Sequence, residues 1–182
     1  MRNTQFVSKI LQASLCAAAA GCAASGALHP NDVPAPLSAP DGQILTQQLH
    51  ATGVQIYRCQ PAKGDPAQFE WSLKQPEAAL FSKAGRTIGK HYAGPTWEAN
   101  DGSKVMGEVI ARANSPAPNA IPWLLLNAKT TSGTGIFGAV RSIQRLHTVG
   151  GTAPADGCNQ AQAGQELRVP YSADYLFYTA RP

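Results

Sequence analysis

The sequence predicts an all-β fold, mostly antiparallel, arranged as a β-sandwich or barrel with at most one or two short helices. From residue 43 onward, polar and apolar residues alternate with a period of two, and the short runs end at Gly or Pro. No regular alternation of strands with long helices follows. Strands of this kind pack as a sandwich or close as a barrel, and they do not build an α/β enzyme fold.

The chain begins with a predicted export signal over residues 1–22. Arg2 and Lys9 precede an apolar run over residues 10–20, which ends in small residues and Cys22. A basic start, an apolar stretch too short to span a bilayer and a small-residue cleavage site are typical of such signals. Cys22 resembles the lipidated cysteine of bacterial lipoproteins; ordinary cleavage close to it, which releases a soluble protein, is the alternative. We therefore expect a periplasmic or outer-membrane-anchored lipoprotein, or otherwise a secreted protein, with the lipid as its membrane contact.

Residues 23–40 are rich in Pro and Ala and are predicted to be a tether, because proline favours extended, semi-rigid backbone. The alternative is a first loop that packs along the domain. Residues 41–182 have the length of a single domain. The chain has 15 basic and 11 acidic residues; without Arg2 and Lys9, thirteen basic residues remain. They are scattered, so nucleic acid is not an expected partner.

The cysteines support export. With Cys16 in the signal and Cys22 lipidated or removed, Cys59 and Cys158 are the pair that remains in the body of the chain. An even pair in an exported chain predicts a disulfide. No CxxC or Cys/His cluster accompanies them, so a structural metal is not expected.

The first strands and turns follow from alternation and turn chemistry. Residues 54–59 and 69–74 each alternate between two faces. Asp101 and Gly102 predict a tight hairpin turn, which would place Trp97 and Val105 on paired strands.

The later strands follow the same logic. The apolar run over residues 123–126 favours a central strand buried on both faces over a short buried helix. Residues 140–149 alternate, with Arg145 and His147 on one face, and residues 171–179 form a closing aromatic strand. A brief helix is expected only over residues 77–83.

Motifs spread along the body carry a resemblance to a known family. They are residues 53–59 (GVQIYRC), Trp71, 91–98 (HYAGPTWE), 101–103 (DGS), 121–126 (IPWLLL), 143–148 (IQRLHT), 150–151 (GG), Cys158 and 169–175 (VPYSADY). With these motifs the chain resembles the DUF3455 family from about residue 42 to 178. The resemblance implies secretion and a β-rich fold, and implies no reaction. A dehydrogenase label carried by some fungal relatives is not supported, since the chain lacks a Gly-x-Gly-x-x-Gly between a strand and a helix.

The segment richest in possible chemistry contains His91, Glu98 and Asp101. A histidine can act as a general base when an acid orients it, so an acid/base hydrolase centred on His91 is one hypothesis. The alternative is structural: Asp101 shapes the hairpin, Trp97 fills the core, Glu98 faces water and His91 binds a backbone carbonyl.

Two further kinds of site are considered. Tyr92, Trp97 and Arg145 are candidate ligand-binding residues, because aromatic walls with a basic rim bind small molecules and glycans. The full set considered for such a wall and rim is Trp71, Trp97, Trp123, Tyr57 and Tyr92 with Arg58, Arg141 or Arg145. A metal site using His91, His147 and an acid has no diagnostic spacing, so no metal and no cofactor is expected.

The sequence therefore predicts an exported binding or envelope-associated module for a small ligand, glycan or partner protein. An acid/base hydrolase and a structural envelope lipoprotein are the alternatives. An enzyme would need His91 and an acid in one concave site, whereas a binding module needs an apolar pocket with few polar groups.

Overall fold

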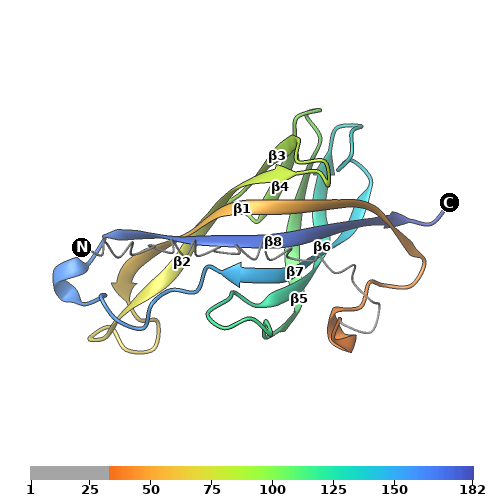
Figure 1. Cartoon of the computed structure of the whole chain (residues 1–182). Coiled ribbons are helices and arrows are strands. Elements are labelled where there is room, and N and C mark those ends of the chain that lie inside the picture. Colours follow the sequence, from red (N-terminus) through yellow and green to blue (C-terminus); the bar gives the residue numbers. More distant parts are fainter. Residues whose placement is uncertain (1–32) are drawn as a thin grey trace, which may run out of the picture.

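The computed structural model describes residues 33–182, which form a closed antiparallel barrel whose strands follow one another in sequence order. The strands are β1 (Gln43–Pro61), β2 (Phe69–Phe81), β3 (Thr87–Tyr92), β4 (Thr96–Ala99), β5 (Lys104–Ala113), β6 (Trp123–Ser132), β7 (Val140–Gly150) and β8 (Glu166–Ala180). Two short 3-10 turns, η2 (Ala35–Leu37) and η3 (Gln160–Gln162), complete the described elements (Figure 1). The predicted all-β class is confirmed, and of its two forms the chain adopts the barrel. The predicted signal, Cys22 and the first part of the predicted tether lie outside the described residues.

The barrel closes because the last strand pairs with the first. The long strands β1 and β8 run side by side from Gln43 opposite Ala180 to Arg58 opposite Glu166 (Figure 1). Alternate side chains then point inward and fill the interior, as the period of two predicts. The inward-facing core consists of Leu49, Ala51, Ala78, Leu80, Trp97, Ala99, Val105, Ile121, Leu124, Leu126, Phe137, Val140, Ile143, Tyr171, Ala173, Tyr175 and Phe177. Within residues 33–182 there is no helix with the length and hydrophobicity of a transmembrane helix.

A second apolar cluster lies on the outside of the barrel. Trp123 and Leu125 point outward from β6, and fully buried Leu37 of η2 packs with them. The amide Nε2 of Gln144 donates to the Leu37 carbonyl over 2.6 Å. The predicted strand over 123–126 is therefore confirmed, buried on both faces, and the last residues of the predicted tether pack on the domain surface.

The predicted helix over residues 77–83 is wrong, because residues 77–81 continue strand β2. Ala78 and Leu80 point into the core, and this stretch of β2 pairs with β1 on one side and β3 on the other. Ala78 also lies directly opposite Gly53. Two neighbouring strands and a buried face outweigh the weak helical propensity of a short Glu-Ala-Ala-Leu run.

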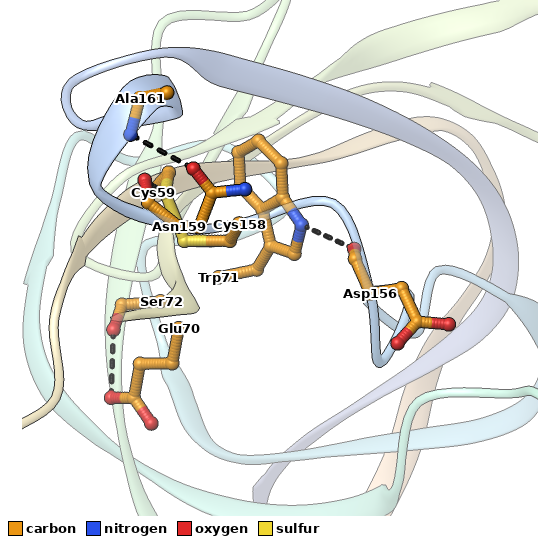
Figure 2. The surroundings of a disulfide bond; sticks show 8 residues. All are labelled: Cys59, Glu70, Trp71, Ser72, Asp156, Cys158, Asn159 and Ala161. Carbon is orange, nitrogen blue, oxygen red and sulfur yellow. Dashed lines mark hydrogen bonds between the residues drawn. A yellow bond between two sulfur atoms is a disulfide. The ribbon is translucent and has the colours of Figure 1, made fainter. Parts of the chain in front are cut away.

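The predicted disulfide is confirmed. Cys59 at the end of β1 is bonded to Cys158 in the loop between β7 and β8, with Cα atoms 5.5 Å apart (Figure 2). Beside it, the indole Nε1 of Trp71 donates to the carbonyl of Asp156 over 3.0 Å. Together the bridge and the indole fasten this long loop to the ends of β1 and β2.

The barrel wall is incomplete at one end, because the β3–β4 hairpin is short. Pairing of β2 with β3 begins only at Ala78 and His91, and β4 pairs with β5 no further than Thr96 and Met106. The preceding part of β2 and the following part of β5 therefore have no partner strand on the sides that flank this hairpin. This short hairpin produces an opening into the barrel interior.

Candidate functional site

A cavity of about 410 Å³ lies at this open end of the barrel. Its apolar wall includes Trp97, Leu124 and Leu126, which are buried. At its rim Leu73 of β2 and Val109 of β5 have exposed fractions of 55% and 36%. The volume and the mostly apolar lining are those of small-molecule sites.

Polar side chains buried in and beside the cavity lack hydrogen-bond partners among residues 33–182. They are the Gln55 amide nitrogen Nε2, the Trp97 indole nitrogen Nε1 and the hydroxyls of Tyr171 and Tyr175. The two hydroxyls lie near each other, and that of Tyr175 lies near Arg145, but none of these approaches has the geometry of a hydrogen bond. Burial raises the pKa of both tyrosines, so both hydroxyls remain protonated at neutral pH. Burying such groups without partners costs free energy, of the order of 1–3 kcal/mol each. Buried polar groups of this kind bind ordered water or a ligand, so these four mark the positions where the cavity offers hydrogen bonds to its contents.

Arg145 supplies a positive charge to this group. It lies on β7 opposite Tyr175 of β8 and lines the cavity. Its Nε and Nη2 atoms donate to the carbonyl of Pro122 over 3.1 and 2.8 Å. No carboxylate of the described residues lies within ion-pair distance of it. The positive charge of Arg145 is therefore not balanced by any acidic side chain of residues 33–182.

His91 forms part of the wall as a neutral ring. Its Nδ1 lies 2.8 Å from the carbonyl oxygen of Thr96, and because a carbonyl only accepts, Nδ1 carries the proton. Burial lowers the pKa of His91 to about 3, although this hydrogen bond favours protonation. Nε2 is therefore unprotonated, able to accept a hydrogen bond but a weak base.

One known protein family matches most of the described part of the chain. The sequence model of DUF3455, described as a protein of unknown function, matches residues 40–179. The chain belongs to the DUF3455 family. No curated protein and no solved structure matched it.

In this DUF3455 chain the acids proposed as partners of His91 lie elsewhere. Glu98 alternates with inward-facing Trp97 along β4 and points outward, where the Tyr92 hydroxyl donates to it over 2.8 Å and Lys104 lies 3.3 Å away. The hydrogen bond from Tyr92 and the nearby Lys104 lower the pKa of Glu98. Tyr92, a predicted ligand residue, is thus a partner of Glu98 on the outer surface and does not line the cavity.

Asp101 shapes the β4–β5 turn. One carboxylate oxygen accepts hydrogen bonds from the Ser103 backbone N–H over 2.9 Å and the Ser103 hydroxyl over 2.6 Å, and the other accepts from the backbone N–H of Ile136 over 2.9 Å. These bonds, above all the one from the Ser103 hydroxyl, lower the pKa of Asp101. The carboxylate therefore joins two loops away from the open end. Trp97 and Val105 lie opposite each other, so the predicted hairpin is confirmed.

Of the predicted ligand residues, Trp97 and Arg145 both line the cavity. Tyr57, which was part of the wider aromatic set, lines it as well, and its hydroxyl donates to the Gly151 carbonyl over 2.6 Å. Sequence reasoning missed Gln55, Tyr171 and Tyr175. The alternation of Tyr171 and Tyr175 along β8 was a usable signal, because it places both rings on one face. The other aromatic and basic residues considered, Trp71, Trp123, Arg58 and Arg141, do not line the cavity.

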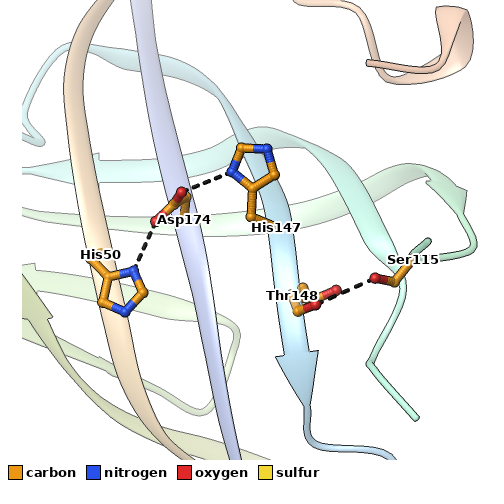
Figure 3. Close-up of polar contacts among 5 residues, drawn as sticks. All are labelled: His50, Ser115, His147, Thr148 and Asp174. Atoms are coloured by element: carbon orange, nitrogen blue, oxygen red, sulfur yellow. Dashed lines mark hydrogen bonds and ion pairs between the residues drawn. The ribbon is translucent and has the colours of Figure 1, made fainter. Parts of the chain in front are cut away.

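His147 lies apart from His91, on the outer surface. The two were considered as metal ligands, and residues 33–182 contain no cluster of metal-ligating side chains. The expectation that His147 shares a face with Arg145 is wrong, since His147 has φ +48° at a break in the pairing of β7 with β8. There its Nδ1 lies 2.9 Å from Asp174, whose other oxygen lies 2.8 Å from Nδ1 of His50 (Figure 3).

Proposed function

We propose that this protein is an exported binding module that holds a small, largely apolar molecule in the barrel cavity. The observation that carries the proposal is the combination of buried apolar walls at Trp97, Leu124 and Leu126 with orphaned polar groups at Gln55 and Tyr175. A ligand with an apolar body and a few polar atoms complements both.

Export is part of the proposal. The predicted N-terminal signal and the Cys59–Cys158 disulfide both support a site of action outside the cytoplasm, since disulfides persist in oxidising compartments. Lipid on Cys22 would hold the module at a membrane. In cell fractionation, a Cys22→Ala variant is then expected to move from the membrane to the soluble fraction. Finding the wild-type protein in the soluble fraction would overturn the proposed lipid anchor, but it would not bear on ligand binding in the cavity.

The binding function is favoured over acid/base catalysis. General base catalysis is most efficient with a group that titrates near neutral pH and an oriented partner. His91 is neutral with a pKa of about 3, and Glu98 has its own partners on the outer surface. The His91 ring is better suited to forming a wall and accepting a hydrogen bond.

The test uses the exported protein as purified from cells and the neutral apolar dye N-phenyl-1-naphthylamine. We expect the fluorescence of the dye to increase on binding to the protein and to reach saturation as the dye concentration rises. Ala93 is exposed in the β3–β4 turn and lines the cavity, so Ala93→Trp should narrow the opening and weaken dye binding. Ala67→Trp, an equally exposed change in the β1–β2 turn, should bind like the wild type, as should Glu98→Gln.

Either of two results would overturn the proposal. The first is the absence of saturable dye binding by a folded wild type. The second is equal binding by the wild type and a folded Ala93→Trp variant, because the dye would then sit somewhere other than the cavity.

A further inference from the structure

We infer that the molecule held in the cavity is an amphipathic monocarboxylate whose carboxylate binds Arg145. This inference rests on the proposed binding function and names the ligand class. Its apolar body would contact Trp97, Leu124 and Leu126, with the carboxylate turned toward the β7–β8 side of the cavity.

The first line of support is charge. The basic residues that line the cavity are Lys74, Arg112 and Arg145, and no Asp or Glu of the described chain lines it. Lys74 already has a carboxylate partner, Glu166, at 2.6 Å. Arg145 is partly buried, donates to the Pro122 carbonyl and lies near the Tyr175 hydroxyl, and both of these partners are neutral. A partly buried cation without a counter-ion favours an anion beside it.

The second line of support is the hydrogen-bonding character of the orphaned groups. Gln55 Nε2 can only donate, and the hydroxyls of Tyr171 and Tyr175 can donate as well. All three side chains are at least 97% buried, with exposed fractions of 1%, 3% and 1% in that order. A carboxylate only accepts and offers two oxygens, whereas an ammonium only donates. The donor-rich cluster therefore selects an acceptor group.

The third line of support is the fixed position of the guanidinium. Nε and Nη2 of Arg145 are anchored on one carbonyl oxygen, and Nη1 takes no part in these two bonds; the Tyr175 hydroxyl is the other polar group near the guanidinium. The Nη1 side of the guanidinium therefore stays available for a charge-assisted bond. Arg112, the other guanidinium of the lining, is exposed to solvent, so the partly buried Arg145 alone matches a single negative charge inside the cavity. A small inorganic anion would leave the apolar wall of the cavity without contacts, whereas an amphipathic carboxylate would cover it.

The experiment compares decanoate with 1-decanol, which share a ten-carbon chain and differ in the charge of the head group. The affinity of the exported protein for each compound is measured at pH 7.5 from the displacement of bound N-phenyl-1-naphthylamine. We expect the wild type to bind decanoate about tenfold or more tightly than decanol. Arg145→Gln should abolish this preference while decanol binding persists. Arg141→Gln, an exposed arginine on the same strand, should keep it.

The outcomes separate the two proposals. Equal affinity of the wild type for decanoate and decanol overturns the inference and leaves the proposed function standing. Retention of the preference in Arg145→Gln also overturns the inference. Absence of dye binding removes the proposed function itself. If Arg145→Gln does not fold, Tyr175→Phe tests the same cluster: it removes one hydroxyl and should selectively weaken decanoate binding.

Discussion

His91 and Trp97 lie face to face on neighbouring strands, with ring centroids 4.4 Å apart and planes 12° apart. They are directly opposite in the β3–β4 register, and both are almost fully buried. The stack makes the imidazole a flat, uncharged continuation of the indole surface. This pair is the reason that the segment richest in chemical groups becomes a cavity wall.

The stability of the protein should depend on pH through His91. Its pKa is about 3 in the folded protein against an ordinary value of 6.5, so below pH 6.5 the unfolded state binds a proton that the native state does not. Above pH 6.5 His91 leaves the unfolding free energy unchanged, and as the pH falls from 6.5 toward 3 its protonation in the unfolded state lowers the unfolding free energy. The unfolding free energy, measured by urea titration at several pH values, should change with pH more steeply in the wild type than in His91→Gln. The difference in slope between pH 6 and 4 should be about 1.4 kcal/mol per pH unit. Parallel slopes would contradict a neutral buried His91.

Loss of the Cys59–Cys158 bridge should destabilise the barrel. The cysteines are 99 positions apart, and a bridge over so long a loop restricts the unfolded chain strongly. The Cys59→Ala/Cys158→Ala protein should lose about 2–4 kcal/mol of unfolding free energy. Thermal unfolding with and without reductant checks this. Reductant should lower the midpoint of the wild type and leave that of the double variant unchanged.

Leu37 should contribute to stability although it lies in the predicted tether. It is fully buried in the outer apolar cluster with Trp123 and Leu125. Leu37→Ala should cost about 2–3 kcal/mol in urea unfolding. Ser38→Ala, an exposed neighbour, should stay within about 0.5 kcal/mol of the wild type. Equal stability of the two variants would mean that this segment does not dock in solution.

Gly53 should tolerate no side chain. A Cβ there would overlap the Glu77 carbonyl oxygen and lie 2.5 Å from the Ala78 Cα, both of them backbone atoms. Gly53→Ala is expected to destabilise by about 1–3 kcal/mol. At Gly64 a Cβ would meet nothing within 4 Å, so Gly64→Ala is the matched control and should be near neutral. Similar urea midpoints for both variants would refute the close packing of β1 on β2.

The local features that could be predicted from the sequence have local causes. Asp101 and Gly102 specify their hairpin through turn geometry, and the run over residues 123–126 is apolar enough to need burial on both faces. The pairing of Cys59 with Cys158 followed from their being the two cysteines left in the body of the chain.

The cavity could not be predicted in the same way. A period of two separates two faces of a strand but does not say which face is inside, and a bulge exchanges them. The break in β7 pairing separates Arg145, which lines the cavity, from His147, which lies outside. The pairing of β8 with β1 and β7 is what buries the hydroxyls of Tyr171 and Tyr175 inside the barrel without hydrogen-bond partners.

The all-β class, the β4–β5 turn, the disulfide and the two-sided burial of residues 123–126 could be read from the sequence, because each depends on neighbouring residues or on a simple count. The folded structure was needed to show that the sheet closes as a barrel, that residues 77–81 are strand, and that Arg145 lies beside Tyr175 while Glu98 lies outside. These features differ from the first group because closure, register and bulges are set by contacts between strands far apart in the chain. Those contacts determine which side chains share one buried space.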